Sequence, residues 1–491
     1  MCFLNVLSCD HCNGCLSNSN FDIIILQTSR LPSILVPLMF RWVSKETPNL
    51  DSMAAQGMLF PNFYTANPLC SPSRASLLTG RLPVRNGFYT SNAYARNAYT
   101  PQEIVGGISK DKILLPQVLK KKGYVNKIIG KWHLGHRAHH LPLEHGFDEW
   151  FGAPNCHFGP YNSSDRPNVP VYNNSQMVGR YTHTQPAHTP TLGVHNTTLD
   201  FIFHQNMAQW PFLLYRAADA THASKRFLGK IMELDYGVGQ ILVWLRALGI
   251  EKDTFVFFTS DNGAAVMSGP KQSKSLTVRF SVGKKLRLRG GVRGPAVPWW
   301  PGHIPASQQL GTVVDLFSTS LSVAGLSVPD DRLIDGLDLS PVLHNNTLIN
   351  RPIFYYRGNE MMAVRVGPYK AHYWTWSNSW EEFNQGSNFC PGQEVAGVTT
   401  HTQQEHTMQP LIFHLGGTPG RNTLSGDVVT KEYQDALSRI TAVVEKHKKG
   451  LVPGVAQLNM CDMAVMNWAP PGCEKLGKSP KSQPWKCDWL H

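Results

Sequence analysis

The sequence of 491 residues contains no apolar run long enough to cross a membrane, and acidic residues are fewer than basic ones. The 46 Lys and Arg against 34 Asp and Glu give a formal net charge of +12, which suits an acidic partner such as a sulfated polysaccharide. No Lys/Arg block is interleaved with aromatic residues, so a nucleic-acid partner is not expected. Without repeats or low-complexity tracts, a chain of this length is expected to fold into two or three globular domains.

The N-terminus lacks a convincing signal peptide, because Met1–Leu7 is short and has no basic start. Cys9, Cys12 and Cys15 have the spacing of metal ligands, but no second half of such a site follows. We therefore expect residues 1–45 to be an atypical N-terminal segment. Glycosylation sequons, which suit a secreted or lysosomal protein, occur at Asn162, Asn173, Asn196 and Asn345.

Residues 70–81, Cys-Ser-Pro-Ser-Arg-Ala-Ser-Leu-Leu-Thr-Gly-Arg, have the pattern of a polar loop that runs into a short helix. Ser71 is expected to cap this helix and Gly80 to end it. Cys70 would then lie just before a helix N-terminus, where the backbone favours negative charge, and Arg74 would lie in the first turn. This combination indicates chemistry on an anionic substrate, although a buried thiol beside a structural arginine fits the spacing as well.

Apolar runs alternate with amphipathic stretches over the first two thirds of the chain, which predicts an α/β domain with a largely parallel, buried sheet. The expected strands are residues 21–26, 59–64, 124–129, 212–215 and 254–259. The expected helices are residues 48–56, 113–122 and 233–248.

Polar residues follow the carboxyl ends of the predicted strands. They are Lys131, His133, His222, Asp261 and Asn262. Each alone could be an ordinary loop residue, but ligands of open α/β sheets bind at this edge. Because all five residues follow strand ends of this kind, we predict that they form one shared site.

The pattern of apolar residues in the sequence changes after residue 338. Short apolar runs at 353–356, 361–366 and 369–376 predict a small antiparallel sheet, and 433–448 predicts a helix. We expect a catalytic domain over 46–350, a C-terminal sheet domain over 351–450 and an irregular tail over 451–491.

The stretch from Cys70 to Arg81 resembles the signature of the type I sulfatases. The resemblance implies an alkaline-phosphatase-like fold with a large, mostly parallel central sheet and a small C-terminal antiparallel sheet. Residues 97–107, 155–161 and 466–474 resemble members that remove 6-sulfate from N-acetylgalactosamine and galactose units of chondroitin sulfate and keratan sulfate. The resemblance extends from about Glu46 to the C-terminus, with one gap.

By this resemblance, Cys70 is oxidised to formylglycine by the formylglycine-generating enzyme, and its hydrated aldehyde attacks sulfur. Catalytic roles are implied for several polar residues: Arg74 beside the nucleophile and metal, Lys131 and Lys284 on sulfate oxygens, His133 assisting the nucleophile's protons, and His222 protonating the leaving alcohol. Tyr99 would line the substrate side.

The resemblance also implies a calcium ion held by residue 70, Asp261 and Asn262, since hard oxygen ligands suit calcium. It further implies a lysosomal homodimer, a glycan on Asn196 and a disulfide between Cys461 and Cys487.

One departure from the family concerns calcium. The family's first strand ends in two aspartates, whose places here fall at 30–31 when counted from Glu46, or at 27–28 at the strand's end. No acidic residue occurs between Asp22 and Glu46. The alternative to an active enzyme is therefore an impaired protein of the same fold, which binds sulfated glycans without turnover.

Overall fold

The structure is a computed structural model. The residues that it describes are 21–27, 47–89, 104, 106–154, 169–181, 188–218, 225–262, 292–305, 308–347, 349–377, 402–415 and 430–458. No helix within these ranges is both long and apolar enough to cross a membrane.

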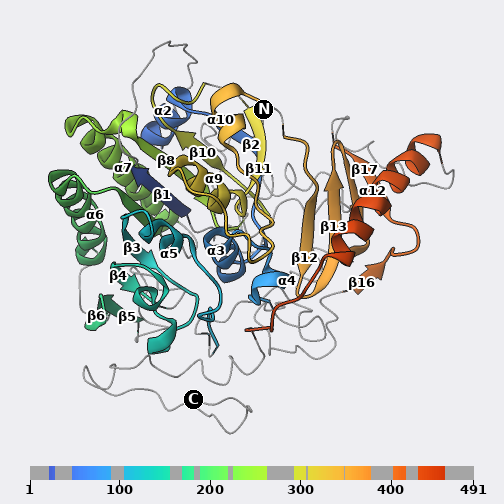
Figure 1. Cartoon of the computed structure of the whole chain (residues 1–491), viewed down its shortest axis with the longest axis horizontal. Helices are drawn as coiled ribbons and strands as arrows, with labels where there is room; N and C mark the ends of the chain where they lie inside the picture. Colours follow the sequence, from blue (N-terminus) through green and yellow to red (C-terminus); the bar gives the residue numbers. More distant parts are fainter. Residues whose placement is uncertain are drawn as a thin grey trace, which may run out of the picture.

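A central sheet of eight strands forms the middle of the molecule, with the order β10-β8-β1-β7-β3-β4-β5-β6 (Figure 1). Its strands are β1 (Phe21–Gln27), β3 (Val125–Lys131), β4 (Glu149–Ala153), β5 (Val169–Asn173), β6 (Gln176–Tyr181), β7 (Phe212–Ala218), β8 (Thr254–Ser260) and β10 (Ala296–Trp299).

Five of these strands share one direction. β3 pairs in parallel with β4 and β7. β8 and β6 run the same way, because each is separated from this group by one antiparallel strand, β1 and β5 respectively. The expected largely parallel sheet is thus a mixed sheet in which β1, β5 and β10 run in the opposite direction.

Helices cover both faces of the central sheet. On one face lie α2 (Pro48–Gln56), α6 (His188–Ala208) and α7 (Lys225–Ala247), whose apolar residues share a core with Ile25, Ile129 and Val256. On the other lie α3 (Cys70–Thr79), α5 (Leu115–Lys120) and α9 (Asp315–Val323), packed against Ile24 and Phe257. The alternation of neighbouring strand residues between two cores is what a sheet buried on both faces requires.

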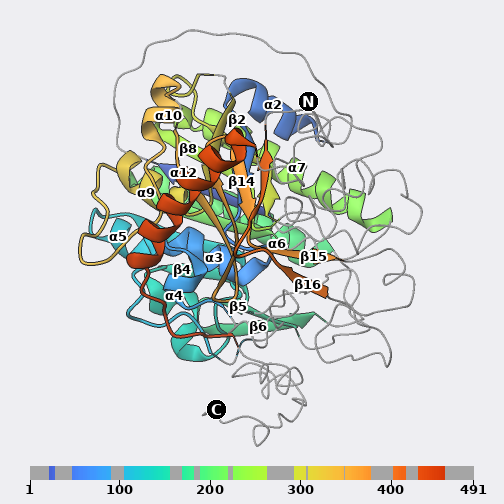
Figure 2. The same cartoon turned by 90° about the vertical axis from the view of Figure 1, so that its right-hand side faces the viewer.

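Further sheets of three and of four strands lie beside this core. β2 (Leu59–Tyr64) pairs with β11 (Gln308–Thr312) and β9 (Arg293–Gly294). The expected C-terminal antiparallel sheet is formed by β12 (Ile353–Arg357), β13 (Glu360–Val366), β14 (Tyr369–His372) and β17 (Leu411–His414), and α12 (Lys431–Lys449) packs on it (Figure 2). Two further short helices are α4 (Pro83–Asn86) and α10 (Ser340–Asn345).

Several predicted elements differ from the structure in their bounds: the helix expected over 113–122 is α5, which spans Leu115–Lys120, and the strand expected over 212–215 extends to Ala218 in β7. The helix expected from residue 233 begins at Lys225. The single strand expected over 369–376 is two strands, because β14 ends at His372 and β15 (Trp374–Ser377) pairs with β16 (Thr402–Glu405) in a separate sheet. At the break, Tyr373 donates its N–H to Met362 and accepts from His406, so the chain changes partners there.

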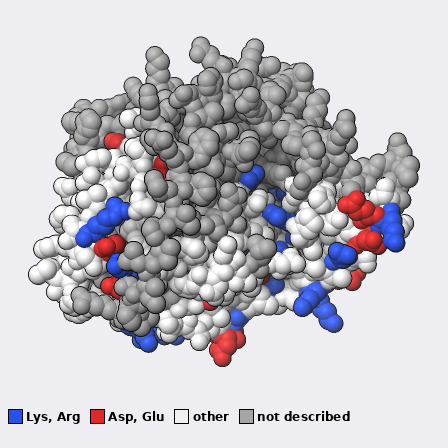
Figure 3. Space-filling view, turned by 90° about the horizontal axis from the view of Figure 1, so that it is seen from above, with Lys and Arg blue, Asp and Glu red and all other residues white. Residues whose placement is uncertain are grey.

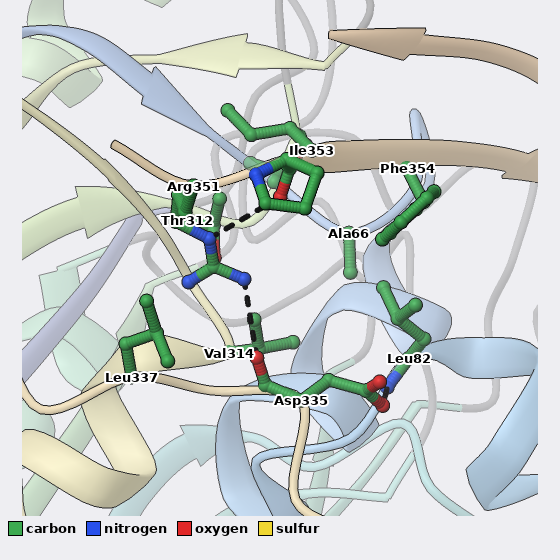
Figure 4. A pocket seen from close by; sticks show the side chains of 11 residues that line it. Ala66, Leu82, Thr312, Val314, Asp335, Leu337, Arg351, Ile353 and Phe354 are labelled. Carbon is green, nitrogen blue, oxygen red and sulfur yellow. Dashed lines mark hydrogen bonds between the residues drawn. The ribbon is translucent and has the colours of Figure 1, made fainter. Parts of the chain in front are cut away.

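A cavity of about 170 Å³ lies where the C-terminal sheet meets the larger part (Figure 4). Its lining includes Ala66, Leu82, Asp335 and Arg351. The Arg351 guanidinium donates to the Asp335 carbonyl at 3.1 Å and forms an ion pair with Asp315, so its charge is already used within the protein. We interpret this cavity as part of the junction between the two regions.

Replacing Gly80 by alanine should destabilise the fold by about 2–4 kcal/mol. Gly80 ends α3 with φ of +66°, a left-handed conformation that costs an alanine about 1 kcal/mol. A Cβ there would also lie 2.7 Å from the Phe317 ring, and overpacking adds about 1–3 kcal/mol. Urea unfolding of Gly80→Ala measures the loss.

Gly123→Ala is the matched control, because Gly123 has φ of +80° but no atom within 4 Å of its would-be Cβ. It should lose only about 1 kcal/mol. Equal losses in the two variants would show that contact with Phe317 contributes nothing.

Candidate active site

The candidate nucleophile is the first residue of a buried helix. α3 begins at Cys70 itself, with Leu69 in the cap position, so the prediction that Ser71 caps the helix is wrong. The preceding loop is instead tied to α3 by Ser73, whose hydroxyl accepts from the Asn67 N–H at 3.2 Å and donates to the Asn67 carbonyl at 2.9 Å. Cys70 is buried at 8% exposure, and Gly80 ends the helix as predicted.

Arg74 lies one turn after Cys70 and joins α3 to three strands. Its Nε donates to Asp261 Oδ2 at 3.0 Å, and both side chains are fully buried. Its Nη1 donates to the Lys131 carbonyl at 2.9 Å and to the Tyr215 hydroxyl at 3.3 Å. These contacts place the ends of β3 and β8 beside the helix that carries Cys70.

Lys131 and His133 lie at the carboxyl end of β3, two residues apart in the sequence. Lys131 is its last residue and is fully buried, and His133 is 1% exposed. His133 has φ of +58°, and its N–H donates to the Pro154 carbonyl at 3.0 Å. A non-glycine residue in this left-handed region is uncommon and costs about 1 kcal/mol or more, and such residues cluster at functional sites.

Asp261 and Asn262 follow β8 directly, as the sequence predicts, and both are buried. Ser260 donates its hydroxyl to the Asn262 carbonyl at 2.6 Å, which fixes the turn after the strand. Because β3 and β8 share one direction, their carboxyl ends lie at the same edge of the sheet. The predicted gathering of polar residues at this edge is therefore observed for Lys131, Asp261 and Asn262.

Several predicted site residues cannot be placed. Tyr99, His222, Lys284, Cys461 and Cys487 lie outside the described residues. Asn196 is described and lies exposed on α6.

The direction of β1 is the main departure from expectation at this edge. β1 runs antiparallel to both neighbours, so Gln27 pairs with Thr254 at the start of β8. Position 27, one place considered for the missing aspartates, therefore lies at the edge opposite Asp261. The residues of β1 that reach the edge of the site are Phe21, paired with Ser260, and Asp22, paired with Thr259.

Tyr215 also belongs to the site, although it is not among the residues predicted from the sequence. It closes the predicted apolar strand 212–215, and its hydroxyl accepts from Arg74. A hydroxyl-bearing ring at the carboxyl end of an otherwise apolar run was the available signal.

The two polar side chains that follow β8 are of the chemical type that binds calcium. Asp261 and Asn262 offer a carboxylate and an amide oxygen, and calcium takes six to eight oxygen ligands. Among the described residues, no group of three or more His, Cys, Asp or Glu side chains is arranged to hold a metal. A calcium ion here therefore needs oxygen ligands beyond these two.

Comparisons with known proteins identify the family of the chain. Residues 39–326 match the sulfatase family. The chain belongs to that family. Residues 349–481 match the C-terminal region of aryl-sulfatases.

Relatives of this sulfatase are similar over most of their length. N-acetylgalactosamine-6-sulfatase of Rattus norvegicus is 61% identical, covering 91% of this chain and 90% of that protein. The Homo sapiens protein of the same name is 59% identical, with the same two coverages. Arylsulfatase A of Bos taurus is 34% identical, covering 81% of this chain and 82% of that protein.

Solved structures confirm the predicted sulfatase fold. The PsFucS1 sulfatase of Pseudoalteromonas sp. superposes with a TM-score of 0.61 at 21% identity, covering 83% of this chain and 86% of that one. The chain is thus a sulfatase enzyme by family. Its candidate site brings Cys70 together with the buried cationic side chains of Arg74 and Lys131.

Breaking the Arg74–Asp261 ion pair should destabilise the sulfatase strongly. Arg74→Met leaves the Asp261 carboxylate buried without its partner, which costs about 3–5 kcal/mol. Asp261→Asn in turn leaves the buried Arg74 guanidinium without this carboxylate. Because each single variant removes the same contact, the double variant should lose clearly less than the sum, as measured by denaturant unfolding at pH 7. Additive losses would mean that the pair carries no coupling energy.

Stability should fall on acidification because of His145. This residue is fully buried against Trp132, and burial lowers its pKa from 6.5 to about 4. The unfolded chain therefore binds more protons between these values, so the free energy of unfolding decreases as pH falls. His145 alone should account for about 2 kcal/mol between pH 7 and pH 5.

Denaturant unfolding of His145→Gln at several pH values tests this assignment, and its pH slope should be shallower than that of the wild type. The exposed His139 gives the control, since His139→Gln should keep the wild-type slope. An unchanged slope in His145→Gln would exclude His145 as a source of the pH dependence.

Proposed function

We propose that this chain hydrolyses the 6-sulfate esters of N-acetylgalactosamine and galactose units in chondroitin sulfate and keratan sulfate. The observation that carries the proposal is the position of Cys70 at the start of α3, one turn from the buried Arg74 and beside the end of β3. The names of the relatives at 59–61% identity support the sugar and the 6-position. The net charge of +12 supports an acidic polymer, and several Lys and Arg side chains are exposed near the middle of the face in Figure 3.

Residue 70 supplies the nucleophile in this proposal. When Cys70 has been converted to formylglycine by the formylglycine-generating enzyme, one hydroxyl of its hydrate would attack sulfur as the bond between sulfur and the sugar oxygen breaks and the sugar alcohol leaves. The second hydroxyl would then lose its proton and expel sulfate, which regenerates the aldehyde. Arg74 holds the N-terminal turn of α3 in place, because its guanidinium donates to Lys131 in β3, to Tyr215 in β7 and to Asp261, which directly follows β8. The sulfate ester is anionic, so it is attracted to this cationic edge.

Lys131 and His133 follow β3 into the same edge. Lys131 binds a sulfate oxygen through its ammonium group, and His133 accepts or donates a proton at the nucleophile. By the resemblance, three residues outside the described ranges complete the site: Lys284 on sulfate oxygens, His222 as proton donor to the leaving alcohol, and Tyr99 on the substrate side.

Calcium is the proposed metal, and Asp261 and Asn262 with residue 70 would hold it. When bound, it supplies positive charge that stabilises the sulfate oxygens. Lysosomal location, a homodimer, the glycan on Asn196 and the Cys461–Cys487 disulfide also belong to the proposal, by resemblance to the family.

A second candidate function is binding of sulfated glycans without turnover. The observation that favours it is the direction of β1, which carries position 27 to the edge opposite Asp261. A weakened calcium site would leave the cationic contacts of Arg74 and Lys131 intact while reducing turnover.

Hydrolysis by the full chain, secreted from cells that express the formylglycine-generating enzyme, tests the proposed function. Sulfate release from 6-sulfated N-acetylgalactosamine, with calcium present, should exceed release from the 4-sulfated isomer. Cys70→Ala should lower turnover by at least about 10³-fold, because it removes the nucleophile.

The control is the same wild-type chain made without the modifying enzyme, in which residue 70 stays a thiol. Mass spectrometry of the peptide that contains residue 70 confirms the modification. Turnover by folded Cys70→Ala would exclude the nucleophile. A modified wild type that binds a sulfated matrix but releases no sulfate would favour the second candidate.

A further inference from the structure

We propose that His140 is a positioning residue that holds His133 in place for proton transfer. The inference rests on the proposed function, in which His133 accepts or donates a proton at the nucleophile. His140 ends η1 (Ala138–His140), a short 3₁₀ helix in the segment between β3 and β4. It acts through the two residues on either side of His133, which are Trp132 and Leu134.

The residue before His133 is tied to η1 through its indole. Trp132 is 1% exposed, and its Nε1–H donates to the His140 carbonyl at 2.8 Å. The indole stacks on His145 with ring centroids 6.0 Å apart, and Phe147 packs edge-on against it at 6.1 Å. Because a buried N–H without an acceptor is costly, this hydrogen bond favours one orientation of the indole. The chain just before His133 is therefore fixed relative to η1.

The residue after His133 is tied to the His140 ring through Ile108. His140 Nδ1 lies 2.8 Å from the Ile108 carbonyl oxygen, and because a carbonyl can only accept, Nδ1 carries the donated proton. The Ile108 N–H in turn donates to the Leu134 carbonyl at 2.8 Å. His140 thus joins Trp132 and Leu134 into one hydrogen-bonded circuit that encloses His133.

Two glycines confine the His140 side chain within this circuit. A Cβ on Gly107 would lie 2.4 Å from His140 Cγ, and a Cβ on Gly135 would lie 2.6 Å from His140 Cβ. Such distances are shorter than any ordinary contact, so the two chain segments close on the histidine from both sides. The position of His140 is therefore set by the segments that it connects.

The backbone of His133 depends on its surroundings for its conformation. Its φ of +58° is uncommon for a residue other than glycine, and such conformations persist where neighbouring structure determines them. Proton transfer requires placement within hydrogen-bond distance, and small displacements reduce rates strongly. Loosening the circuit should therefore slow the chemical step more than it weakens substrate binding.

Steady-state hydrolysis by His140→Leu tests the proposal on the full chain with formylglycine at residue 70. Leucine removes the donor to the Ile108 carbonyl, so kcat for sulfate release from 6-sulfated N-acetylgalactosamine should fall about tenfold or more. KM should change by less than about twofold, because the proton-transfer group is displaced and a sulfate-binding group is not.

Three further variants make the test specific. His140→Asn keeps an amide N–H that can replace Nδ1–H, so its kcat should stay within about threefold of the wild type. Trp132→Phe keeps a ring but loses the indole N–H, and its kcat should fall as in His140→Leu. His139→Leu makes the same change at the exposed neighbouring histidine and should keep the wild-type constants. Thermal unfolding midpoints above the assay temperature show that each variant is folded.

A double-variant comparison separates positioning from a general loss of structure. In a His133→Ala background, His140→Leu should lower kcat by less than about twofold further, because the group that it positions is gone. An equal fold-loss in both backgrounds would overturn the proposal. A His140→Asn variant as slow as His140→Leu would overturn it as well, and so would an effect confined to KM.

These outcomes are distinct from failure of the proposed function, because the same variants are also assayed with 4-nitrophenyl sulfate. If the wild type hydrolyses this aryl ester but not the 6-sulfated sugar, and the kcat pattern holds, the role of His140 stands and the substrate assignment fails. If the wild type and His140→Leu release sulfate from the sugar at equal rates, the hydrolysis stands and the role of His140 fails. A wild type that hydrolyses neither ester would overturn both.

Discussion

The buried ion pair between Arg74 and Asp261 is the contact on which the geometry of this site depends. Burying both charges costs several kcal/mol per ion, which only good geometry and further hydrogen bonds repay. The guanidinium meets this condition with acceptors from Asp261, Lys131 and Tyr215. Because these acceptors lie in β3 and β7 and directly after β8, the position of α3, and of Cys70 at its start, is set by the central sheet.

Local patterns predicted the elements of this site well but could not predict how they are arranged. The strands at 59–64 and 254–259 and the helix at 48–56 match within a residue, because hydrophobic periodicity and Gly or Pro boundaries are local signals. The cap of α3 was predicted wrongly, since Ser73 ties the preceding loop through a contact six residues away in sequence. The acceptors of Arg74 are up to 187 residues away in the sequence, so the local spacing of residues around Arg74 could not predict them.

The direction of β1 shows the limit of such prediction most clearly. The apolar run of β1 is buried on both faces of the sheet, with Ile24 and Leu26 in one core and Ile25 in the other. Such a run is compatible with either direction of the strand. Only the pairing with β7 and β8 fixes the direction, and that pairing depends on contacts about 190 to 240 residues away. Which end of β1 reaches the site therefore could not be predicted from the strand itself.

Gly130 explains why the cationic side of the site is so closely tied to the sheet. It has φ of +102°, and a Cβ there would lie 2.0 Å from the Ala217 carbonyl oxygen. Only glycine therefore allows β3 to approach β7 this closely at the point where Lys131 follows. Since the Lys131 carbonyl also accepts from Arg74, the approach of these two strands sets the positions of both cations together. A change in the spacing of β3 and β7 would move the two positive charges as a unit relative to residue 70.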